Sequence, residues 1–384
     1  MTQLNCPIYL DCNASSPLEP RVQEHLISLL EEGLSNPSSR THSAGLRANK
    51  KLEDARKTLA LLLETNPTEV IFTSGATEAN NLALLGSHSL SHGERGTSIV
   101  TTCNEHSSIF SPLSALRQNG VDIRIAPVTA QGNITAESIL DLIDETTTLV
   151  SITHVSGESG FVSPLSEVAA ALDESGPILH VDSAQGFTKE NHLLASSRID
   201  LISVSSHKIN GPKGVGALIG RRSSRKAMRR LRPILFGGGQ ERSLRPGTAP
   251  VELISAFVYA AELAFKERDE RVDAWKRTAV AIQEAFETKN TYVVTDPNEA
   301  IGNCVCLGIR GIDSEAVILA LKDVAWFSNG SACSSGKSTA SRAYLSLEEV
   351  NTRFVARELF RLSWCHLTPE VPIKMIQDKL KPLR

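Results

Sequence analysis

The sequence has no long apolar run, few aromatic residues and almost no net charge, and these shortages exclude several classes of protein. No stretch approaches the ~20 apolar residues that a membrane-spanning helix needs. The 40 Lys and Arg residues against 43 Asp and Glu leave a net charge of −3, so the chain as a whole has no attraction to nucleic acid or anionic lipid. Because the first residues lack both a basic region and an apolar stretch, we expect no signal peptide.

Cysteines are few, odd in number and irregularly spaced, at positions 6, 12, 103, 304, 306, 333 and 365. None lies in a CxxC pair or at the spacing of zinc ligands, so we predict no metal site. Free thiols of this kind are typical of a reducing cytoplasm, where we expect the protein. Cys304 and Cys306 alternate on a predicted strand and are expected to face a core. The cysteines at 6, 12, 103 and 365 receive the same interpretation.

What the chain does have is the composition of a globular protein, with 41% hydrophobic and 22% charged residues. Residues 20–64 read as two helices broken near Gly33–Pro37, and after them short apolar strands alternate with helix-length segments. This alternation predicts a mainly parallel sheet covered on both faces. The predicted strands are Glu69–Ser74, Ser98–Cys103, Val121–Val128, Thr148–Thr153, Ile178–Asp182, Leu201–Ser205 and Val215–Ile219, and helices among them are Ala76–Leu90, His106–Asn119 and Leu165–Ser175.

A second, smaller domain is predicted beyond this sheet. A long helical pattern runs from about Val251 to Glu287, followed by a strand near Asn303–Ile309, a helix near Ser314–Lys322 and a terminal helix. The pattern is typical of a small domain joined to the large one by a long helix.

Three loops that follow predicted strands carry residues capable of chemistry, and ligands of parallel sheets bind in such loops. Thr73–Glu78 opens a helix, where free N–H groups suit a phosphate, although an ordinary capped turn accounts for the same residues. Asp182 ends a strand, where it would pair with a cationic ring nitrogen or a metal, or simply cap a helix. Lys208, beside His207, is placed for Schiff-base chemistry, although most loop lysines are only solvated.

A phosphate cradle, an aspartate and a lysine together match pyridoxal 5'-phosphate, whose aldehyde a lysine holds and whose ring nitrogen an aspartate keeps protonated. Further ordered motifs are Tyr9–Asp11, Asn36–Arg40, Thr73–Asn80, Glu105-His106, His180–Gln185, Ser206–Lys208, Gly238–Thr248 and Gly330–Cys333. On these motifs the chain resembles, nearly end to end, the cysteine desulfurases, a NifS/IscS-like class of fold-type I pyridoxal-phosphate enzymes.

The resemblance implies an α/β fold with a mainly parallel seven-stranded sheet. That sheet would form a large cofactor-binding domain from residues 15–257. Residues 1–14 and 258–384 would form a smaller α+β domain that carries the Cys333 loop.

The resemblance also implies roles for individual residues. Lys208 would hold the cofactor and shuttle protons, Asp182 would pair with the ring nitrogen, and His106 would stack on the ring and serve in acid–base steps. Thr248 would reach the phosphate of a neighbouring subunit, so a homodimer is expected. The other cofactor contacts would come from Gly75, Ala76, Thr77, Gln185, Ser205 and His207.

Substrate and sulfur handling follow from the same resemblance. Arg361 matches the arginine that binds the substrate carboxylate, for which its forked donors are suited, and Asn36 lies in the substrate loop. Cys333 matches the nucleophile that takes sulfur from L-cysteine as a persulfide, leaving L-alanine, and passes it to a protein acceptor. A cysteine outside such a pattern is usually inert.

The sequence departs from the family pattern at several positions. Gly157 stands where the family usually has an asparagine that approaches the cofactor, so one hydrogen bond is in doubt. Cys12 replaces the residue that follows the Leu-Asp step, and nothing in the sequence explains it. Cys365-His366 stands where relatives often have a glycine and an arginine.

Several functional alternatives stay open. Arg221–Arg232 holds seven basic residues, which form either a solvated helix face or a docking site for an acidic acceptor or nucleic acid. The stretch Leu231–Arg242, with Ala184–Phe187, resembles desulfurases that serve bacterial DNA phosphorothioation, so an indirect association with DNA-modification proteins is expected. The alternatives are a sulfur donor for iron–sulfur clusters or tRNA thiolation, a lyase for selenocysteine or another β-substituted amino acid, and a catalytically silent scaffold.

Overall fold

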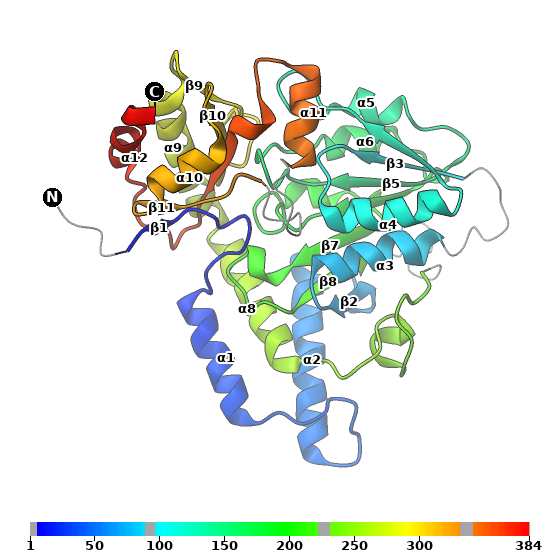
Figure 1. The fold of residues 1–384 in the computed structure, drawn as a ribbon. Helices are drawn as coiled ribbons and strands as arrows, with labels where there is room; N and C mark the ends of the chain where they lie inside the picture. Colours follow the sequence, from blue (N-terminus) through cyan, green and yellow to red (C-terminus); the bar gives the residue numbers. More distant parts are fainter. Residues whose placement is uncertain (1–5, 89–96, 222–230, 331–340, 384) are drawn as a thin grey trace.

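The computed structural model describes residues 6–88, 97–221, 231–330 and 341–383, and its largest element is a seven-stranded sheet (Figure 1). The strand order is β2-β8-β7-β6-β5-β3-β4, and only β8 runs antiparallel to its neighbours. The predicted α/β fold with a mainly parallel seven-stranded sheet is therefore confirmed. The strands are β2 (Val70–Thr73), β3 (Ser98–Thr102), β4 (Asp122–Ala126), β5 (Thr147–Thr153), β6 (Ile178–Asp182), β7 (Leu201–Ser205) and β8 (Gly216–Gly220).

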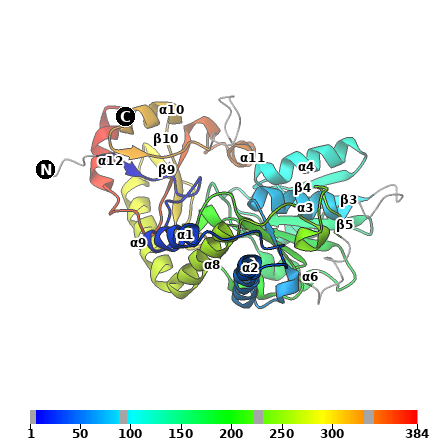
Figure 2. The same ribbon diagram turned by 90° about the horizontal axis from the view of Figure 1, so that it is seen from below.

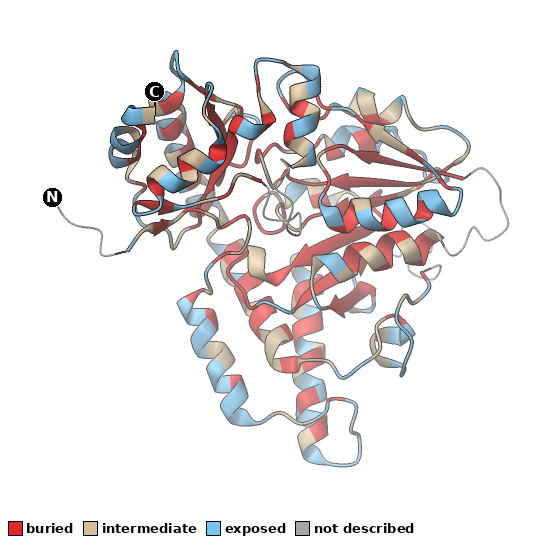
Figure 3. Cartoon of the chain, in the orientation of Figure 1, coloured by how far each residue is buried: buried red, intermediate tan, exposed pale blue. Residues whose placement is uncertain are grey.

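Helices cover both faces of this sheet because its strands are apolar on both sides. On one face Ile99 and Leu149 pack against α3 (Ala76–His88) and α4 (Ser107–Gln118). On the other face Val100 and Val150 belong to the large core that includes α2 (Ser43–Leu62), α6 (Leu165–Ala171) and α8 (Val251–Lys266). The short helix α5 (Ala136–Leu140) lies near β3 and β4. Figure 3 shows the strands as almost continuously buried, whereas α1 (Pro20–Glu32) is largely exposed.

The smaller unit contains a three-stranded antiparallel sheet in the order β12-β10-β9 and a parallel pair of β1 with β11. Its core is a second hydrophobic cluster that includes Leu10, Val305 and Phe360. The elements are β1 (Ile8–Tyr9), α9 (Arg268–Phe286), β9 (Thr291–Val293), β10 (Cys304–Ile309), α10 (Ser314–Leu321), β11 (Ala325–Trp326), α11 (Arg342–Val350), β12 (Leu359–Ser363) and α12 (Ile373–Leu380).

The single long helix predicted from Val251 to Glu287 is wrong, because the structure has two helices there. Glu267 separates α8 from α9 with a non-helical φ of −102° and ψ of 10°. Its carboxylate accepts hydrogen bonds from Arg21 and Arg271, which holds the break in place. Figure 2 shows α1, α2 and α8 side by side below the sheet, with α9 continuing into the smaller unit.

Within the described ranges, no helix is long and apolar enough to cross a membrane. The same ranges contain no group of three or more His, Cys, Asp or Glu residues placed to hold a metal ion.

Candidate active site

The residues singled out in the loops converge at one edge of the large sheet. Asp182 is the last residue of β6, and Lys208 ends the short 3-10 helix that follows β7. His106 caps α4, which follows β3. Because these strands are parallel, their carboxyl ends share one edge. Asp182 and Lys208 both act on His106, the first raising and the second lowering the pKa of the imidazole, which places the three charges close together.

Asp182 is a buried carboxylate held by neutral donors. Its Oδ2 accepts a 2.7 Å hydrogen bond from Asn80 Nδ2, and its Oδ1 accepts one of 3.0 Å from the Ala184 N–H. No Lys, Arg or His ion-pairs with it in the part of the chain that the structure describes. A buried anion is costly without a cation. The carboxylate therefore fits the protonated ring nitrogen of a pyridine cofactor.

The Lys208 amine is held by the segment that follows β1. It donates to the carbonyls of Asn13 and Ala14, the latter at 2.9 Å. Gln185 Nε2 donates to the same Asn13 carbonyl at 2.8 Å. The sequence did not point to Asn13, because the atom that acts here is its main-chain oxygen. Any residue has that atom, so the residue type gives no signal. Asn80 lies within the Thr73–Asn80 motif, but its contact with Asp182 depends on the sheet bringing two distant segments together.

His106 is positioned as a neutral acid–base group. Its Nδ1 accepts the Ser108 N–H at 3.1 Å, which places the ring proton on Nε2. Burial lowers the pKa of the imidazole, and the charge on Lys208 lowers it further. The adjacent Glu105 is fully enclosed, and burial raises the pKa of its carboxyl to about 8.

The predicted phosphate residues lie at the start of α3 and just after β7. Gly75 immediately precedes α3, and Ala76 and Thr77 begin its first turn, where main-chain N–H groups point out of the helix. A Cβ on Gly216 of β8 would lie 2.7 Å from Gly75 Cα, so this close approach requires a glycine. Strand β8 therefore packs directly against the turn at Gly75 and fixes the backbone of that turn.

Ser205 and His207 stand on the β7 side of this site. Ser205 is buried at the end of the strand, and His207 Nδ1 contacts Ser15 Oγ at 3.3 Å. Burial, followed by the charges of Lys208 and Lys213, lowers the pKa of His207 to about 4. The ring is therefore neutral near pH 7 and is able to donate one hydrogen bond to an anion.

Arg361 on β12 is buried and already engaged. Its Nη2 contacts Asp11 Oδ1 at 2.7 Å, and its Nη1 contacts Glu158 Oε2 at 3.2 Å and the Gly157 carbonyl at 2.8 Å. Its Nε is buried and has no hydrogen-bond partner in the described part of the chain. Two carboxylates therefore occupy the fork that the sequence assigns to a substrate carboxylate.

Two predicted residues do not join the Lys208 group in this chain. Asn36 lies on the exposed turn between α1 and α2, and Thr248 is exposed just before α8. Their sequence neighbours Pro37 and Ala249 both line a separate cavity of about 410 Å³. Cys333 and the rest of positions 331–340 lie outside the described residues.

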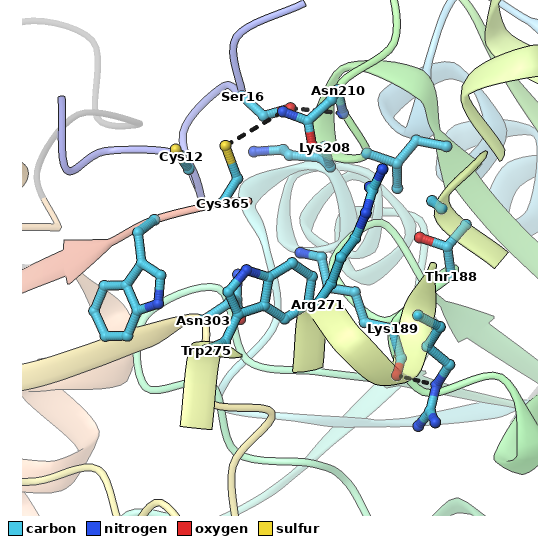
Figure 4. Close-up of a pocket in the computed structure, with 14 residues that line it drawn as sticks. Cys12, Ser16, Thr188, Lys189, Lys208, Asn210, Arg271, Trp275, Asn303 and Cys365 are labelled. Carbon is cyan, nitrogen blue, oxygen red and sulfur yellow. Dashed lines mark hydrogen bonds between the residues drawn. The ribbon is translucent and has the colours of Figure 1, made fainter. Parts of the chain in front are cut away.

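The departures from the family pattern have visible surroundings. A Cβ at Gly157 would have Gln185 Nε2 as its nearest neighbour at 3.7 Å, so a side chain there would stand beside that amide. Cys12 and Cys365 lie together in a small enclosed cavity that Lys208 also lines (Figure 4).

The predictions for the other cysteines and for the basic segment are mixed. Cys304 and Cys306 are buried, as predicted, but Cys6 is exposed, because it precedes β1 and packs against no core. Arg221 is not part of a solvated helix face, because it is buried and donates to the Ser196 carbonyl at 3.0 Å. Positions 222–230 of the segment lie outside the described ranges.

Comparison with known proteins agrees with this geometry. Residues 8–369 match the family model described as aminotransferase class-V. The cysteine desulfurase IscS of Rickettsia felis is 38% identical over 86% of this chain and 80% of its own length.

Solved structures give the same result. A NifS-like protein has a TM-score of 0.88 with 28% identity, covering 98% of this chain and 99% of that one. DndA from Streptomyces lividans has a TM-score of 0.77 with 34% identity, covering 93% and 99%. A structure of SspA in complex with cysteine has a TM-score of 0.78 with 27% identity, covering 94% and 100%.

The fold and the site define a fold-type I, pyridoxal-phosphate-dependent enzyme of aminotransferase class V. Within that class the chain belongs to the cysteine desulfurases of the NifS/IscS-like group. The arrangement fits the cofactor on independent grounds, since Asp182 is a buried anion with no cationic partner among the described residues and Lys208 lies at the same edge of the sheet.

Proposed function

We propose that this enzyme converts L-cysteine to L-alanine and carries the released sulfur as a persulfide on Cys333. The observation that carries the proposal is the convergence of Lys208, Asp182 and His106 at one edge of the sheet. The family's chemistry supports it, and Cys333 stands in the family's nucleophile motif.

Pyridoxal phosphate supplies an electron sink that weakens the bonds at the substrate α-carbon. In this proposal the chain's own residues position that group and move protons. Asp182 holds the proton on the ring nitrogen, and Lys208 Nζ takes and returns the α-proton. Neutral His106 carries its proton on Nε2 and donates a hydrogen bond from that atom, and its lowered pKa keeps the ring in this neutral form at pH 7.

Arg361 would bind the substrate carboxylate by exchanging one anionic partner for another. Its fork now contacts Glu158 at 3.2 Å, longer than the 2.7 Å contact with Asp11. Because the Glu158 contact is the longer one, we expect the substrate to displace Glu158 and to leave Asp11 in place. A bidentate carboxylate contact gains both charge and geometric specificity.

The enzyme would act as a homodimer in the cytoplasm. Thr248 and Asn36 lie beside the separate 410 Å³ cavity and away from the Lys208 group, as expected if they complete the site of a second copy. The α1–α2 region also exposes the large apolar side chains of Ile27, Leu30 and Leu46. Analytical ultracentrifugation of the holoenzyme tests this, and a monomer at micromolar concentration would contradict it.

Assaying L-cysteine and L-selenocysteine in parallel tests the reaction itself. We expect the wild type to form alanine from both substrates, and Cys333→Ala to lose activity with L-cysteine only. Equal activity of the variant on L-cysteine would favour the lyase alternative, in which no enzyme thiol attacks sulfur. Bound cofactor with no turnover of either substrate would favour a silent scaffold.

For the acceptor, we propose a protein of the DNA phosphorothioation system. The stretch Leu231–Arg242 resembles that branch of desulfurases. Of the three solved structures named above, DndA has the highest sequence identity to this chain. Complementation of a desulfurase-deficient host tests the choice. Restored sulfur in DNA would support it. Restored iron–sulfur enzymes or tRNA thiolation without DNA sulfur would favour the general donor instead.

A further inference from the structure

Two of the departures from the family pattern, 353 positions apart, meet in space beside Lys208. Cys12 follows β1 and Cys365 follows β12, and both thiols contact Thr368 Oγ1, at 3.8 and 3.7 Å. Each thiol also shifts the pKa of the other, which places the two sulfur atoms close together. Figure 4 shows both sulfur atoms at the end of the cavity where Lys208 and Asn210 lie.

The surroundings of this pair are polar on the side of Cys365. Asn210 Nδ2 donates to Cys365 Sγ at 3.4 Å, and the Cys365 N–H donates to Thr368 Oγ1 at 3.0 Å. The ammonium group of Lys189 lies near both thiols and attracts their anionic forms. A thiol that receives several donors and faces a cation is stabilised as a thiolate, the reactive form of cysteine.

The two cysteines are electronically unequal. The neighbouring Cys12, together with hydrogen bonds from Asn210 and the Leu367 N–H, lowers the pKa of Cys365. The neighbouring Cys365 and burial raise the pKa of Cys12. When a thiolate lies beside a thiol, the thiolate reacts first with an oxidant, and the thiol then attacks the oxidised sulfur to form a disulfide.

The pair is enclosed, and its cavity shares two lining residues with a larger one. Cys12 is 4% exposed and Cys365 7%, in a cavity of about 20 Å³ that has room for roughly one water-sized molecule. Lys189 and Arg268 line this cavity and also a second cavity of about 360 Å³. Access is therefore restricted to small polar molecules, which excludes oxidants of the size of glutathione disulfide.

We propose that Cys12 and Cys365 form a redox-active dithiol that hydrogen peroxide oxidises to a disulfide. The Cys365 thiolate attacks one peroxide oxygen, the O–O bond breaks, and the hydroxide released takes a proton and leaves as water. The Cys12 thiol then attacks the resulting sulfenic sulfur. The S–S bond forms, the S–O bond breaks, and a second water leaves with the Cys12 proton, so that one peroxide is reduced while two thiols are oxidised.

The position of Cys12 connects this bond to the active site. The preceding residue, Asp11, pairs with Arg361, and the carbonyls of the next two, Asn13 and Ala14, accept from Lys208. A disulfide that draws Cys12 toward Cys365 therefore changes the anchors of both the lysine and the arginine. This consequence depends on the proposed function, whereas formation of the disulfide does not.

Peptide mapping of the holoenzyme tests the disulfide directly. In a Cys333→Ser background, which removes the proposed nucleophile, we expect peroxide to link the Cys12 and Cys365 peptides, dithiothreitol to release them, and glutathione disulfide to have little effect. Cys103→Ser, which removes a buried thiol elsewhere, should still form the link, and Cys12→Ser should not. The exposed Cys6 reports whether peroxide has reacted with the protein. If Cys6 is oxidised while Cys12 and Cys365 stay unlinked, the proposal is overturned.

A second readout separates this proposal from the proposed function. In the same background, we expect the absorbance change of the bound cofactor on adding L-cysteine to become at least several-fold slower after oxidation and to recover with dithiothreitol. A linked pair with an unchanged rate would overturn the connection to the active site but keep the dithiol. A linked pair in a protein that shows no absorbance response even when reduced would instead count against the proposed function.

Discussion

Asp182 shows how a single residue prepares this site for a charged ring. The carboxylate is buried, and among the described residues its direct partners are the Asn80 amide and one main-chain N–H, at 2.7 and 3.0 Å. Asn80 itself is fully buried, and its Oδ1 makes no hydrogen bond within the same ranges. In the function proposed above, the cation that pairs with this carboxylate comes with the cofactor.

Asp182→Asn should lower turnover by roughly 10- to 150-fold, the equivalent of losing one charged hydrogen bond. The cofactor's absorbance spectrum and its dissociation constant should change with it. Asp200→Asn is the matched control, because Asp200 is also a buried carboxylate but pairs with Arg198 before β7, at the opposite end of the strand. Asp200→Asn should lower the stability of the protein but leave the cofactor's absorbance spectrum unchanged. The same loss of turnover in both variants would contradict the assignment.

Two glycines near the cofactor residues should respond differently to the same substitution. A Cβ at Gly186 would lie 2.1 Å from His154 Nδ1, whereas the nearest atom to a Cβ at Gly157 is 3.7 Å away. Gly186→Ala should therefore lower the free energy of unfolding by about 1–3 kcal/mol. Gly157→Ala should be neutral or stabilising by up to about 1 kcal/mol. Urea unfolding measures both, and equal midpoints would contradict the packing described here.

Among the elements, the central strands are joined by a buried histidine. His180 in β6 contacts Ser151 of β5 at 2.9 Å and Ser203 of β7 at 3.0 Å, and burial lowers the pKa of its ring to about 3. Below pH 6.5 the unfolded chain binds a proton at this position that the folded chain does not bind. The histidine therefore favours unfolding as the pH falls from about 6.5 to about 3.

His180→Asn should be less stable than the wild type at pH 7, because the two serine contacts are lost or weakened. Its free energy of unfolding should then fall less steeply between pH 6.5 and pH 4.5 than that of the wild type. Urea titrations across this range measure the slope. A slope equal to that of the wild type would show that His180 does not contribute to acid destabilisation.

The segment before α8 is held by one buried ion pair. Glu241, Arg242 and Ser243 have φ values of 45°, 58° and 63°, a left-handed run that non-glycine residues rarely adopt. The Glu241 carboxylate contacts Arg56 of α2 at 2.6 and 2.8 Å and accepts the N–H of Phe72 in β2 at 2.9 Å. These contacts hold the strained turn against both elements.

Glu241→Gln should lower the free energy of unfolding by about 3–5 kcal/mol, because it removes the only carboxylate described here that is buried together with Arg56. Glu53→Gln is the matched control. Glu53 also contacts Arg56, at 3.1 Å, but its side chain is 43% exposed, so the loss should stay below about 1 kcal/mol. Thermal unfolding of both variants tests this, and a larger effect at Glu53 would contradict it.

At the level of the whole molecule, the large sheet could be predicted because its strands carry a local signal. Each run, such as Ile178–Asp182 or Leu201–Ser205, is apolar and bounded by polar loops, and the structure places all seven within about two residues of the prediction. The break at Glu267 could not be predicted, because contacts with the distant Arg21 help to hold it. The two-residue strands β1 and β11 are too short to leave a pattern.

The active site was predictable only in part, for a similar reason. Asp182 ends a strand and Lys208 follows one, so both could be found from local sequence, whereas His106 could be named only through the family resemblance. The main-chain contribution of Asn13 and the meeting of Cys12 with Cys365 depend on contacts between distant segments. The division of the chain into domains at residues 15 and 257 remains a prediction.

The most direct test of the account is a single-turnover experiment without added reductant. The wild-type holoenzyme should release one alanine per active site from L-cysteine and then stop, with the mass of one sulfur atom added to the peptide that contains Cys333. Cys333→Ala should keep the yellow cofactor and release no alanine. Continued turnover in the variant, or sulfur on a different cysteine of the wild type, would contradict the account.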